Sequence, residues 1–308
     1  MTFDCIVVGG GAAGLSAALV LGRARRRTLL VDAGAPSNRV AHGIGGQLGY
    51  DGRPPAELYA AGAAELAAYP SVERRAGTVV GGARRGDVVE LELDDGTRET
   101  ARRVVLATGM DYRLPDVPGA AERWGRSVFH CPFCHGWEVR DRPLGVLQRG
   151  AQGAERAVLL RVWSDDVTLY TDGPAELDDD AAERLRAAGV EVDERGIAEL
   201  RGPGDELSAV VFADGGERRC EGLLVPADLA PRSDLAEQLE VVEGGPVLLA
   251  GDAAGVMPSV PNAIAAGATA AAMVVHGLMD ELAAAPRSAA TQRPPAVSAG
   301  REPGTVAG

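Results

Sequence analysis

The sequence is short of several residue types, and each shortage excludes a class of protein. Aromatic residues make up only 4% of the 308 residues, while glycine is abundant at 41, so we expect tight turns rather than an aromatic core. Lys and Arg number 31 against 44 Asp and Glu, giving a formal net charge of -13. Binding to nucleic acid or to an anionic membrane through general charge attraction therefore has no basis.

Long apolar runs are also missing. No stretch reaches 18 apolar residues without interruption, although a membrane-spanning helix needs about 20. The apolar segment near the N-terminus has the acidic Asp4 before it and four arginines between positions 23 and 27 after it. This order is the reverse of the charge order in a secretory signal peptide. We therefore expect a cytoplasmic protein with no membrane span.

Cysteine is scarce, because four residues are too few for a disulfide-stabilised scaffold. Cys5 and Cys220 stand alone inside apolar stretches, where a free cysteine is usually buried. Cys131 and Cys134 are the only close pair and lie in the segment HCPFCHGWE, residues 130–138. A pair with this spacing, followed directly by a histidine, fits covalent haem attachment, half of a zinc site, or a dithiol that cycles to a disulfide.

The apolar segments that are present predict an α/β fold. Residues 4–8 are predicted to form a buried strand, and a glycine-rich turn leads from it into an Ala- and Leu-rich helix. Residues 28–32 form the next predicted strand, which completes a βαβ unit. Strand-type segments continue between residues 72 and 106, with a hairpin turn at Asp95-Gly96.

The same alternation returns after the cysteine pair. We predict strands at 144–147 and 167–170, a helix between them, and a second helix at 178–188. A strand at 247–250 and an Ala-rich helix at about 262–282 follow. The chain is therefore predicted to hold two doubly wound, Rossmann-like units. Pro, Ala, Gly, Ser and Thr dominate residues 283–308, which are predicted to be a disordered tail.

The first turn carries a dinucleotide-binding fingerprint. Gly9, Gly11 and Gly14 have the G-x-G-x-x-G spacing between a strand and a helix, and Asp32 ends the next strand. The glycines permit the turn, the approach of backbone N–H groups to a pyrophosphate, and close packing of helix on strand. Ala13 belongs to the same predicted cofactor-binding turn. The positive end of the helix explains how an acidic protein holds an anion without lysines there.

Two further turns follow predicted strands. Ala107, Thr108 and Gly109 follow the strand at 104–106, and Gly251 and Asp252 follow the strand at 247–250. Cofactors bind at such strand ends in doubly wound sheets, so all five residues are candidate cofactor ligands. The alternative for the carboxylate is that it only caps the next helix.

The dithiol interpretation of the cysteine pair is the one that fits the rest of the chain. A zinc site normally needs four ligands, and His42 and His276 lack any ligand spacing. Covalent haem implies an exported and usually helical protein. We therefore predict no metal site and a dithiol that works beside a dinucleotide cofactor. A thiol pKa lowered from about 8.5 to near 7 raises the thiolate fraction from roughly 3% to about half.

Two side chains after the pair are candidates for managing the thiol proton. His135 is predicted to act as the base, and a surface histidine is the alternative. Glu138 is more simply explained as a solvated carboxylate. Loops 38–50 and 257–261 are expected to shape access to the cofactor, although His42 is left out of the catalytic set.

On these motifs the chain resembles the thioredoxin reductase-like flavoproteins. The resemblance covers about residues 4–282, through GGGAAGLSAA, ATG, CPFC and GDAAG. It implies an FAD-binding domain formed by residues 1–112 and 230–282. It also implies an NAD(P)-binding-like domain at 113–229 that carries the CxxC, and a homodimer.

The resemblance also implies roles for the two sulfur atoms. Cys134 would face the flavin C4a atom and exchange electrons with it, while Cys131 would meet the external substrate. Thioredoxin reductases usually have Asp after the second cysteine, and here His135 gives a CxxCHG segment. That segment is similar to the dithiol oxidases that close disulfides in gliotoxin- and holomycin-type natural products, with the histidine as base.

The second doubly wound unit departs from the family. Its turn, residues 147–153, lacks the G-x-G-x-x-G or G-x-G-x-x-A order. No arginine pair follows the strand at 167–170, and Asp172 there would repel a 2′-phosphate. Tight NAD(P)H binding is therefore not expected. The stretch 225–251 also looks shorter than in the family, which suggests that part of the linking β-structure is lost.

Together these observations predict an FAD-dependent dithiol/disulfide oxidoreductase that works as an oxidase. Electrons would pass from a small-molecule dithiol through Cys131, Cys134 and FAD to O2. The first alternative is an NADPH-dependent thioredoxin reductase-type enzyme that reduces a thioredoxin-like protein. The second alternative is a flavin-binding or redox-sensing module without turnover.

Overall fold

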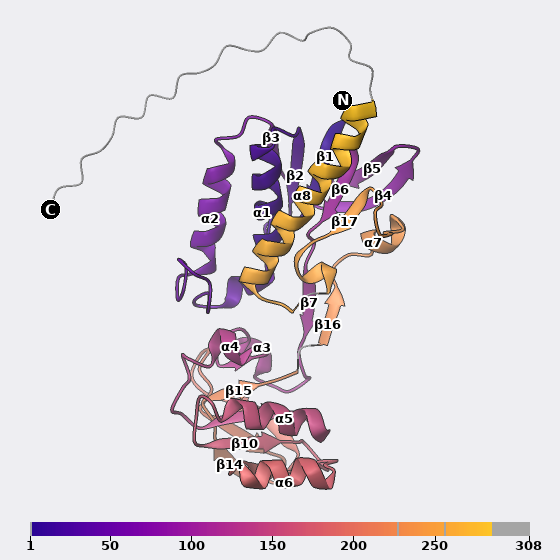
Figure 1. The fold of residues 1–308 in the computed structure, drawn as a ribbon. Helices are drawn as coiled ribbons and strands as arrows, with labels where there is room; N and C mark the ends of the chain where they lie inside the picture. The colour runs from indigo at the N-terminus through magenta and orange to yellow at the C-terminus, as the bar shows by residue number, and fades with distance from the viewer. Residues whose placement is uncertain (1, 227, 256, 285–308) are drawn as a thin grey trace, which may run out of the picture.

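The computed structural model describes residues 2–226, 228–255 and 257–284. The chain forms two α/β lobes, each built on a largely parallel sheet, and a narrow ribbon joins them (Figure 1). We call them the outer lobe, which contains both the first strand and the last helix, and the inner lobe. The predicted fold class, two Rossmann-like units with the first one discontinuous, is confirmed.

The outer lobe contains a seven-stranded sheet in the order β3-β2-β1-β6-β5-β4, with β17 also paired to β6. Its strands are β1 (Phe3–Val8), β2 (Thr28–Asp32), β3 (Val72–Ala76), β4 (Val79–Arg85), β5 (Val88–Leu93), β6 (Arg98–Leu106) and β17 (Val247–Leu249). The apolar β1 lies between β2 and β6 in the middle of the sheet. Nearly all of its residues are buried, as expected for a parallel strand whose sheet is covered on both faces. The predicted turn at Asp95-Gly96 joins the antiparallel strands β5 and β6.

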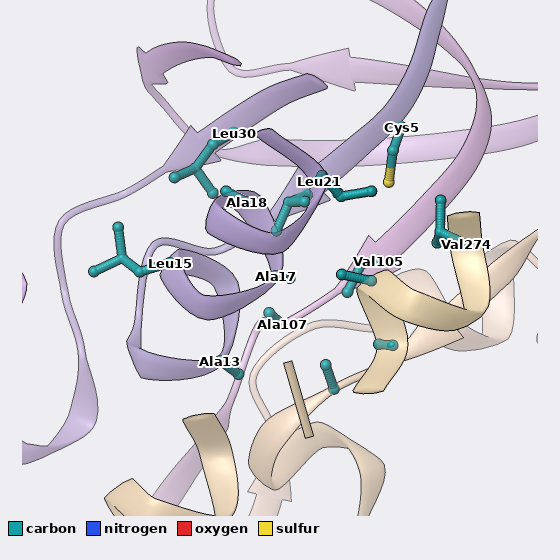
Figure 2. Packing of buried hydrophobic residues seen from close by; sticks show 14 of the residues in the cluster. Cys5, Ala13, Leu15, Ala17, Ala18, Leu21, Leu30, Val105, Ala107 and Val274 are labelled. Carbon is teal, nitrogen blue, oxygen red and sulfur yellow. The ribbon is translucent and has the colours of Figure 1, made fainter. Parts of the chain in front are cut away.

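Helices cover the outer sheet. They are α1 (Ala12–Arg23), α2 (Pro55–Leu66) and α8 (Val260–Ala284). Small side chains let α1 and α8 approach closely, since a Cβ on Gly267 would overlap the Ala13 carbonyl. Figure 2 shows Leu21 of α1, Val274 of α8 and Cys5 of β1 in one buried cluster.

Part of α8, Val260–Met279, is by length and mean hydropathy the one described helix that would suit a membrane. Polar residues such as Asn262 and His276 interrupt this segment, so it contains no uninterrupted apolar run of membrane-spanning length. One face of α8 is instead buried on α1, through Ala270, Ala271 and Val274. This face holds α8 against the rest of the outer lobe.

The inner lobe contains a five-stranded parallel sheet in the order β11-β10-β9-β15-β8. Its elements are β8 (Val128–Phe129), β9 (Leu144–Leu147), β10 (Val167–Tyr170), β11 (Glu191–Asp193), β15 (Gly222–Leu224), α3 (Ala120–Arg123), α4 (Pro132–His135), α5 (Gly150–Leu160) and α6 (Asp179–Ala187). A separate three-stranded sheet, which the sequence pattern did not predict, consists of β12 (Ile197–Arg201), β13 (Ala209–Phe212) and β14 (Glu217–Arg219). Cys220 is buried in this lobe as expected.

The chain crosses between the lobes twice, and the crossings pair as an antiparallel ribbon of β7 (Met110–Arg113) and β16 (Asp228–Pro231). The predicted domain boundaries at 112/113 and 229/230 fall inside this ribbon. Because β16 lies within it, the short stretch from 225 to 251 still holds linking β-structure. The helix α7 (Leu235–Gln238) follows the ribbon. Two 3-10 turns complete the elements, η1 (Ser37–Val40) and η2 (Gly251–Ala254).

The end of α8 differs slightly from the prediction. The helix was expected to end at 282 and continues to Ala284, so the first two residues of the predicted tail are helical. Residues 285–308, the rest of the predicted disordered tail, lie outside the described residues.

Candidate active site

A cavity of about 700 Å³ lies at the strand ends of the outer lobe and reaches the inner lobe. Its volume is within the range of roughly 300–1,000 Å³ found for ligand sites. Nine of the ten predicted cofactor-binding residues line it: Gly9, Gly11, Ala13, Asp32, Ala107, Thr108, Gly109, Gly251 and Asp252. The tenth, Gly14, lies behind the wall, where it supports the turn. Parts of both loops predicted to shape access, 38–50 and 257–261, also line the cavity.

The glycine turn is shaped to let a ligand approach its backbone. Gly9 has a φ of 103°, and a Cβ there would overlap the Ala107 carbonyl. A Cβ on Gly14 would overlap the Gly9 carbonyl oxygen, whereas a Cβ on Gly11 would meet nothing within 4 Å. No side chain caps the start of α1. The first N–H groups of the helix are therefore available to an anion such as a pyrophosphate.

Asp32 is held at the end of β2 by the turn itself. Its Oδ1 accepts hydrogen bonds from the backbone N–H of Gly10, at 3.2 Å, and of Gly34, at 2.8 Å. Asp32 lines the cavity, and no hydrogen bond to its Oδ2 is found among the described residues, so this oxygen could accept from a ribose hydroxyl. The placement matches the role predicted for an acid at this strand end.

Asp252 faces the cavity from η2. The Tyr112 hydroxyl lies 3.4 Å from its Oδ2, and burial raises the pKa of this carboxyl. The sequence also allowed Asp252 to act only as a helix cap. Among the described residues, however, its side chain makes no capping hydrogen bond. Tyr112 itself, and the Tyr59 hydroxyl that donates to Asn38 at 2.6 Å, were not predicted as site residues. Only the folded chain brings these residues together.

The cysteine pair lies where the two lobes meet. Cys131 and Cys134 form a disulfide with a Cα–Cα distance of 5.3 Å, and Cys131 is the N-cap of α4. Cys134 lines the cavity, whereas Cys131 does not. Gly45 of the outer lobe packs directly on Cys134, since a Cβ there would lie 3.0 Å from the Cys134 Cα. The two cysteines therefore differ in their relation to the cavity.

His135 also lines the cavity and is held in one tautomer. Its Nε2 lies 3.0 Å from the carbonyl oxygen of Gly125, so Nε2 carries the proton that it donates. Nδ1 is then unprotonated, and it is buried without a hydrogen-bond partner. Burial lowers the pKa of His135, while the backbone carbonyl of Gly125, the charge of Glu138 and the backbone of Cys131 oppose that effect. A neutral imidazole with a free lone pair is what a base for a thiol requires.

His130 is a site residue that the sequence pattern did not single out. It lines the cavity directly before Cys131, and its ring packs against Tyr112 and Trp124 with centroid distances of 4.8 and 5.5 Å. Its pKa is lowered to about 4, chiefly by burial, with smaller contributions from His135 and Arg156. In the sequence, only its position directly before Cys131 could have indicated that His130 belongs to the site.

The corresponding turn of the inner lobe is bridged by a side chain. A Cβ on Gly153 would overlap the Gln148 carbonyl, the same close packing that Gly14 and Gly9 show. At the position that corresponds to Gly10, however, stands Arg149. Its side chain spans to the end of β10.

Arg149 donates to two backbone carbonyls beyond β10. Its Nε donates to the Thr171 oxygen at 2.8 Å, and Nη2 donates to the Asp172 oxygen. Its Nη1 lies 3.7 Å from a carboxylate oxygen of Glu176. Asp172 uses Oδ1 to accept from the Ile197 N–H at 2.7 Å. The guanidinium therefore lies where the adenosine ribose of a dinucleotide would meet the strand end.

Comparison with known proteins agrees with this architecture. A family model described as "Pyridine nucleotide-disulphide oxidoreductase" matches residues 3–270. Thioredoxin reductase tcpT of Claviceps purpurea is 31% identical over 309 residues, covering 91% of this chain and 95% of that protein. A putative thioredoxin reductase TrxB from Bacillus anthracis is 32% identical with a TM-score of 0.86, covering 91% of this chain and 99% of that one. The structure of HlmI is 37% identical with a TM-score of 0.87, covering 92% and 94%.

Proposed function

Because the chain belongs to the pyridine nucleotide-disulphide oxidoreductase family, we propose that it is an FAD-dependent dithiol oxidase. It oxidises a small-molecule dithiol to a disulfide and passes the two electrons to O2. The single observation that carries this direction is Arg149, whose guanidinium lies across the nucleotide turn of the inner lobe. Electrons then enter from the thiol side rather than from a pyridine nucleotide.

The cavity of the outer lobe fits FAD. Backbone N–H groups at the start of α1 would hold the pyrophosphate, and Asp32 would accept from the ribose. Open space beside Gly11 leaves room for the ligand to approach. When bound there, FAD supplies a two-electron acceptor that returns the cysteine pair to its disulfide and delivers the electrons to O2 as hydrogen peroxide.

The chain's own residues account for the thiol chemistry. A substrate thiolate attacks the Cys131 sulfur, the Cys131–Cys134 bond breaks, and Cys134 leaves as a thiolate beside the cavity. The second substrate thiolate attacks the substrate sulfur of the mixed disulfide, which closes the substrate disulfide and releases Cys131 as a thiolate. His135 takes a thiol proton on Nδ1, because only the thiolate attacks at a useful rate.

Anaerobic mixing of the flavin-loaded protein with one reductant at a time tests the direction. We expect dithiothreitol to bleach the visible flavin absorbance, NADPH at micromolar concentration to leave it unchanged, and readmitted oxygen to give hydrogen peroxide over many cycles. Cys131→Ser should lose turnover and keep its flavin, while Cys220→Ala, which removes a buried thiol elsewhere, should keep both. Rapid bleaching by NADPH would overturn the oxidase direction.

The alternative is the reverse reaction, from NADPH through flavin to a thioredoxin-like protein. The names of the relatives, which include thioredoxin reductases, favour it. The same mixing experiment separates the two directions. A module without turnover is excluded if peroxide continues to form well beyond one equivalent per cysteine pair.

We also propose that the substrate is a small dithiol and that the protein acts in the cytoplasm as a homodimer. Light scattering coupled to size-exclusion chromatography measures the assembly directly, and a monomeric mass at micromolar concentration would contradict the dimer.

A further inference from the structure

A polar cluster at the boundary between the lobes takes no part in the reaction above. The two chain crossings between the lobes form the narrow ribbon of β7 and β16, and a two-stranded ribbon has little stability of its own. Motion of one lobe relative to the other is therefore expected unless further contacts hold them together. Such contacts join residues 38–45 of the outer lobe, which we call the bridging loop, to the inner lobe beside the redox pair.

The bridging loop is anchored on the outer lobe and reaches the second cysteine. The Tyr59 hydroxyl of α2 donates to the Asn38 side chain at 2.6 Å. Ile44 is buried and exchanges backbone hydrogen bonds of 2.9 Å with the segment that precedes α2. A Cβ on Gly45 would overlap the backbone carbonyl of Cys134, so the end of the loop packs directly on the redox pair. Figure 1 shows the chain between β2 and α2 on the side of the outer lobe that faces α4.

Arg126 of the inner lobe reaches across the boundary to the bridging loop. Its Nε donates to the backbone carbonyl of Val40 at 3.0 Å, and its Nη1 forms an ion pair with Asp205. Oδ2 of Asp205 in turn lies 3.2 Å from Nε2 of His42. The inner lobe thus holds both a backbone oxygen and a side chain of the bridging loop, and the two contacts share one ion pair.

The inner-lobe side of this cluster is fixed by its own hydrogen bonds. The Ser127 hydroxyl donates to the Asp205 carbonyl at 2.6 Å and accepts from the Leu207 N–H at 3.0 Å. The buried Arg123 donates to the Glu206 carbonyl at 3.1 Å. The carboxylate of Asp205 is therefore presented to the boundary from an ordered backbone, which reduces the entropy lost when it binds the loop.

The same segment of the inner lobe also holds the proposed base. Gly125, directly before Arg126, accepts the hydrogen bond of His135 Nε2 at 3.0 Å. A Cβ on Gly125 would overlap the Val40 side chain, so this backbone also packs on the bridging loop. The loop therefore contacts the inner lobe both on Cys134 and beside the partner of His135. If the lobes separated here, both side chains would move away from the cavity that they line.

We propose that Arg126 and Asp205 are positioning residues: they form a clamp that holds the bridging loop on the inner lobe and so keeps Cys134 at the cavity. The step that the clamp serves closes the Cys131–Cys134 bond again, as two electrons pass to the bound FAD and the remaining thiol protons are released. This step needs contact between sulfur and flavin, whereas the attack on Cys131, which does not line the cavity, does not. The proposal rests on the proposed function only in that FAD occupies the cavity.

Labelling of Cys134 in the flavin-free protein tests the clamp without any turnover. In a Cys131→Ser background, Cys134 is the accessible thiol of the redox segment, and Cys5 and Cys220 are fully buried. A maleimide attached to a long polyethylene glycol chain adds a large mass to each labelled thiol. Because the reagent is bulky, its rate reports how often the bridging loop moves away from Cys134.

We expect Arg126→Gln and Asp205→Asn to raise the rate of Cys134 labelling about 5- to 10-fold, since each removes a partly exposed, charged contact of the clamp. Gly45→Ala opens the boundary by a different means, because its Cβ would overlap the Cys134 carbonyl. It should also raise the rate. An unchanged rate in all three variants would contradict the clamp.

Arg184→Gln is the matched control, because it removes an equal charge from an exposed position on α6. Its labelling rate should equal that of the Cys131→Ser parent. Equal labelling of Arg126→Gln and Arg184→Gln would overturn the proposal. Labelling of Cys220 as fast as Cys134 in Arg126→Gln would also overturn it, because a buried thiol becomes accessible only when the fold itself opens.

Rapid anaerobic mixing of the flavin-loaded protein with dithiothreitol separates the two steps. The thiol content after an acid quench follows the opening of the disulfide, and the flavin absorbance follows electron transfer. We expect Arg126→Gln to keep the first rate within about twofold and to lower the second about 5- to 10-fold. Equal slowing of both rates would place the effect at substrate attack and contradict the positioning role.

These outcomes are separate from those that test the oxidase direction. If NADPH bleaches the flavin while Arg126→Gln still speeds the labelling of Cys134, the direction fails and the clamp stands. If dithiothreitol alone bleaches the flavin and Arg126→Gln is labelled like Arg184→Gln, the direction stands and the clamp fails.

Discussion

Two glycines of the first turn distinguish binding of FAD from stability of the fold. A Cβ on Gly14 would overlap the backbone carbonyl of Gly9, and a backbone atom cannot rotate away. We expect Gly14→Ala to cost about 1–3 kcal/mol of unfolding free energy through overpacking. For a chain of this size, that lowers Tm by roughly 2–12 °C.

Gly11→Ala should behave in the opposite way. Gly11 has φ -70° and ψ -172°, which any residue adopts, and its Cβ would meet nothing within 4 Å. The flavin-free protein should therefore keep its stability within about 0.5 kcal/mol. The new methyl group would instead obstruct the approach of a charged pyrophosphate to the backbone N–H groups. A hydrogen bond to a charged group contributes about 1.5–3 kcal/mol, so the FAD dissociation constant should rise roughly 10- to 100-fold.

Differential scanning fluorimetry of the flavin-free protein and titration of flavin fluorescence measure the two effects separately. The reasoning requires the variants to separate, with Gly14→Ala losing stability before any ligand is added and Gly11→Ala losing affinity alone. A Gly11→Ala protein that binds FAD as tightly as the wild type would refute the assignment of this turn to the pyrophosphate.

Two further predictions concern stability. The pKa of His130 is about 4 in the folded protein and about 6.5 in an unfolded chain. Between these pH values the unfolded state binds one proton more than the folded state does. The free energy of unfolding of the wild type should therefore fall by about 2–3 kcal/mol as the pH falls from about 6.5 to about 4. Urea unfolding of His130→Gln should lack that part of the loss, and equal pH dependence of the two proteins would contradict it. Arg123 is only 6% exposed and donates to the carbonyls of Gly119, Gly202 and Glu206. Arg123→Met should therefore cost about 2–4 kcal/mol in urea, with Arg184→Gln as a control that stays within about 0.5 kcal/mol.

The strands of the sheets were predictable wherever a run of apolar, β-branched residues ends in a sharp turn. Strands β2, β9 and β10 have the predicted bounds, because each run is buried on both faces. The helix α2 was not predicted, since its Ala-rich sequence shows only a weak apolar stripe. The sheet of β12, β13 and β14 was missed as well, because its short strands mix charged and apolar residues.

The site residues likewise fall into a predictable group and a group that could not be predicted. Residues in strand-end turns, such as Gly9 and Asp32, were predictable because strand, turn and helix lie next to each other in the sequence. Tyr112 and Tyr59 reach the cavity from the ribbon and from α2, so only the tertiary fold brings them to it.

The glycine turns of the two lobes differ at one position that bears on nucleotide binding. Both turns pack helix on strand through a glycine, Gly14 in the outer lobe and Gly153 in the inner lobe. In the outer lobe the residue at the second position is Gly10, and its N–H holds the carboxylate of Asp32 toward the cavity. In the inner lobe Arg149 stands at this position, and its guanidinium donates hydrogen bonds to the backbone carbonyls of Thr171 and Asp172. The backbone packing of the turn is the same in both lobes, and we expect this one side chain to make the two turns differ in what they bind.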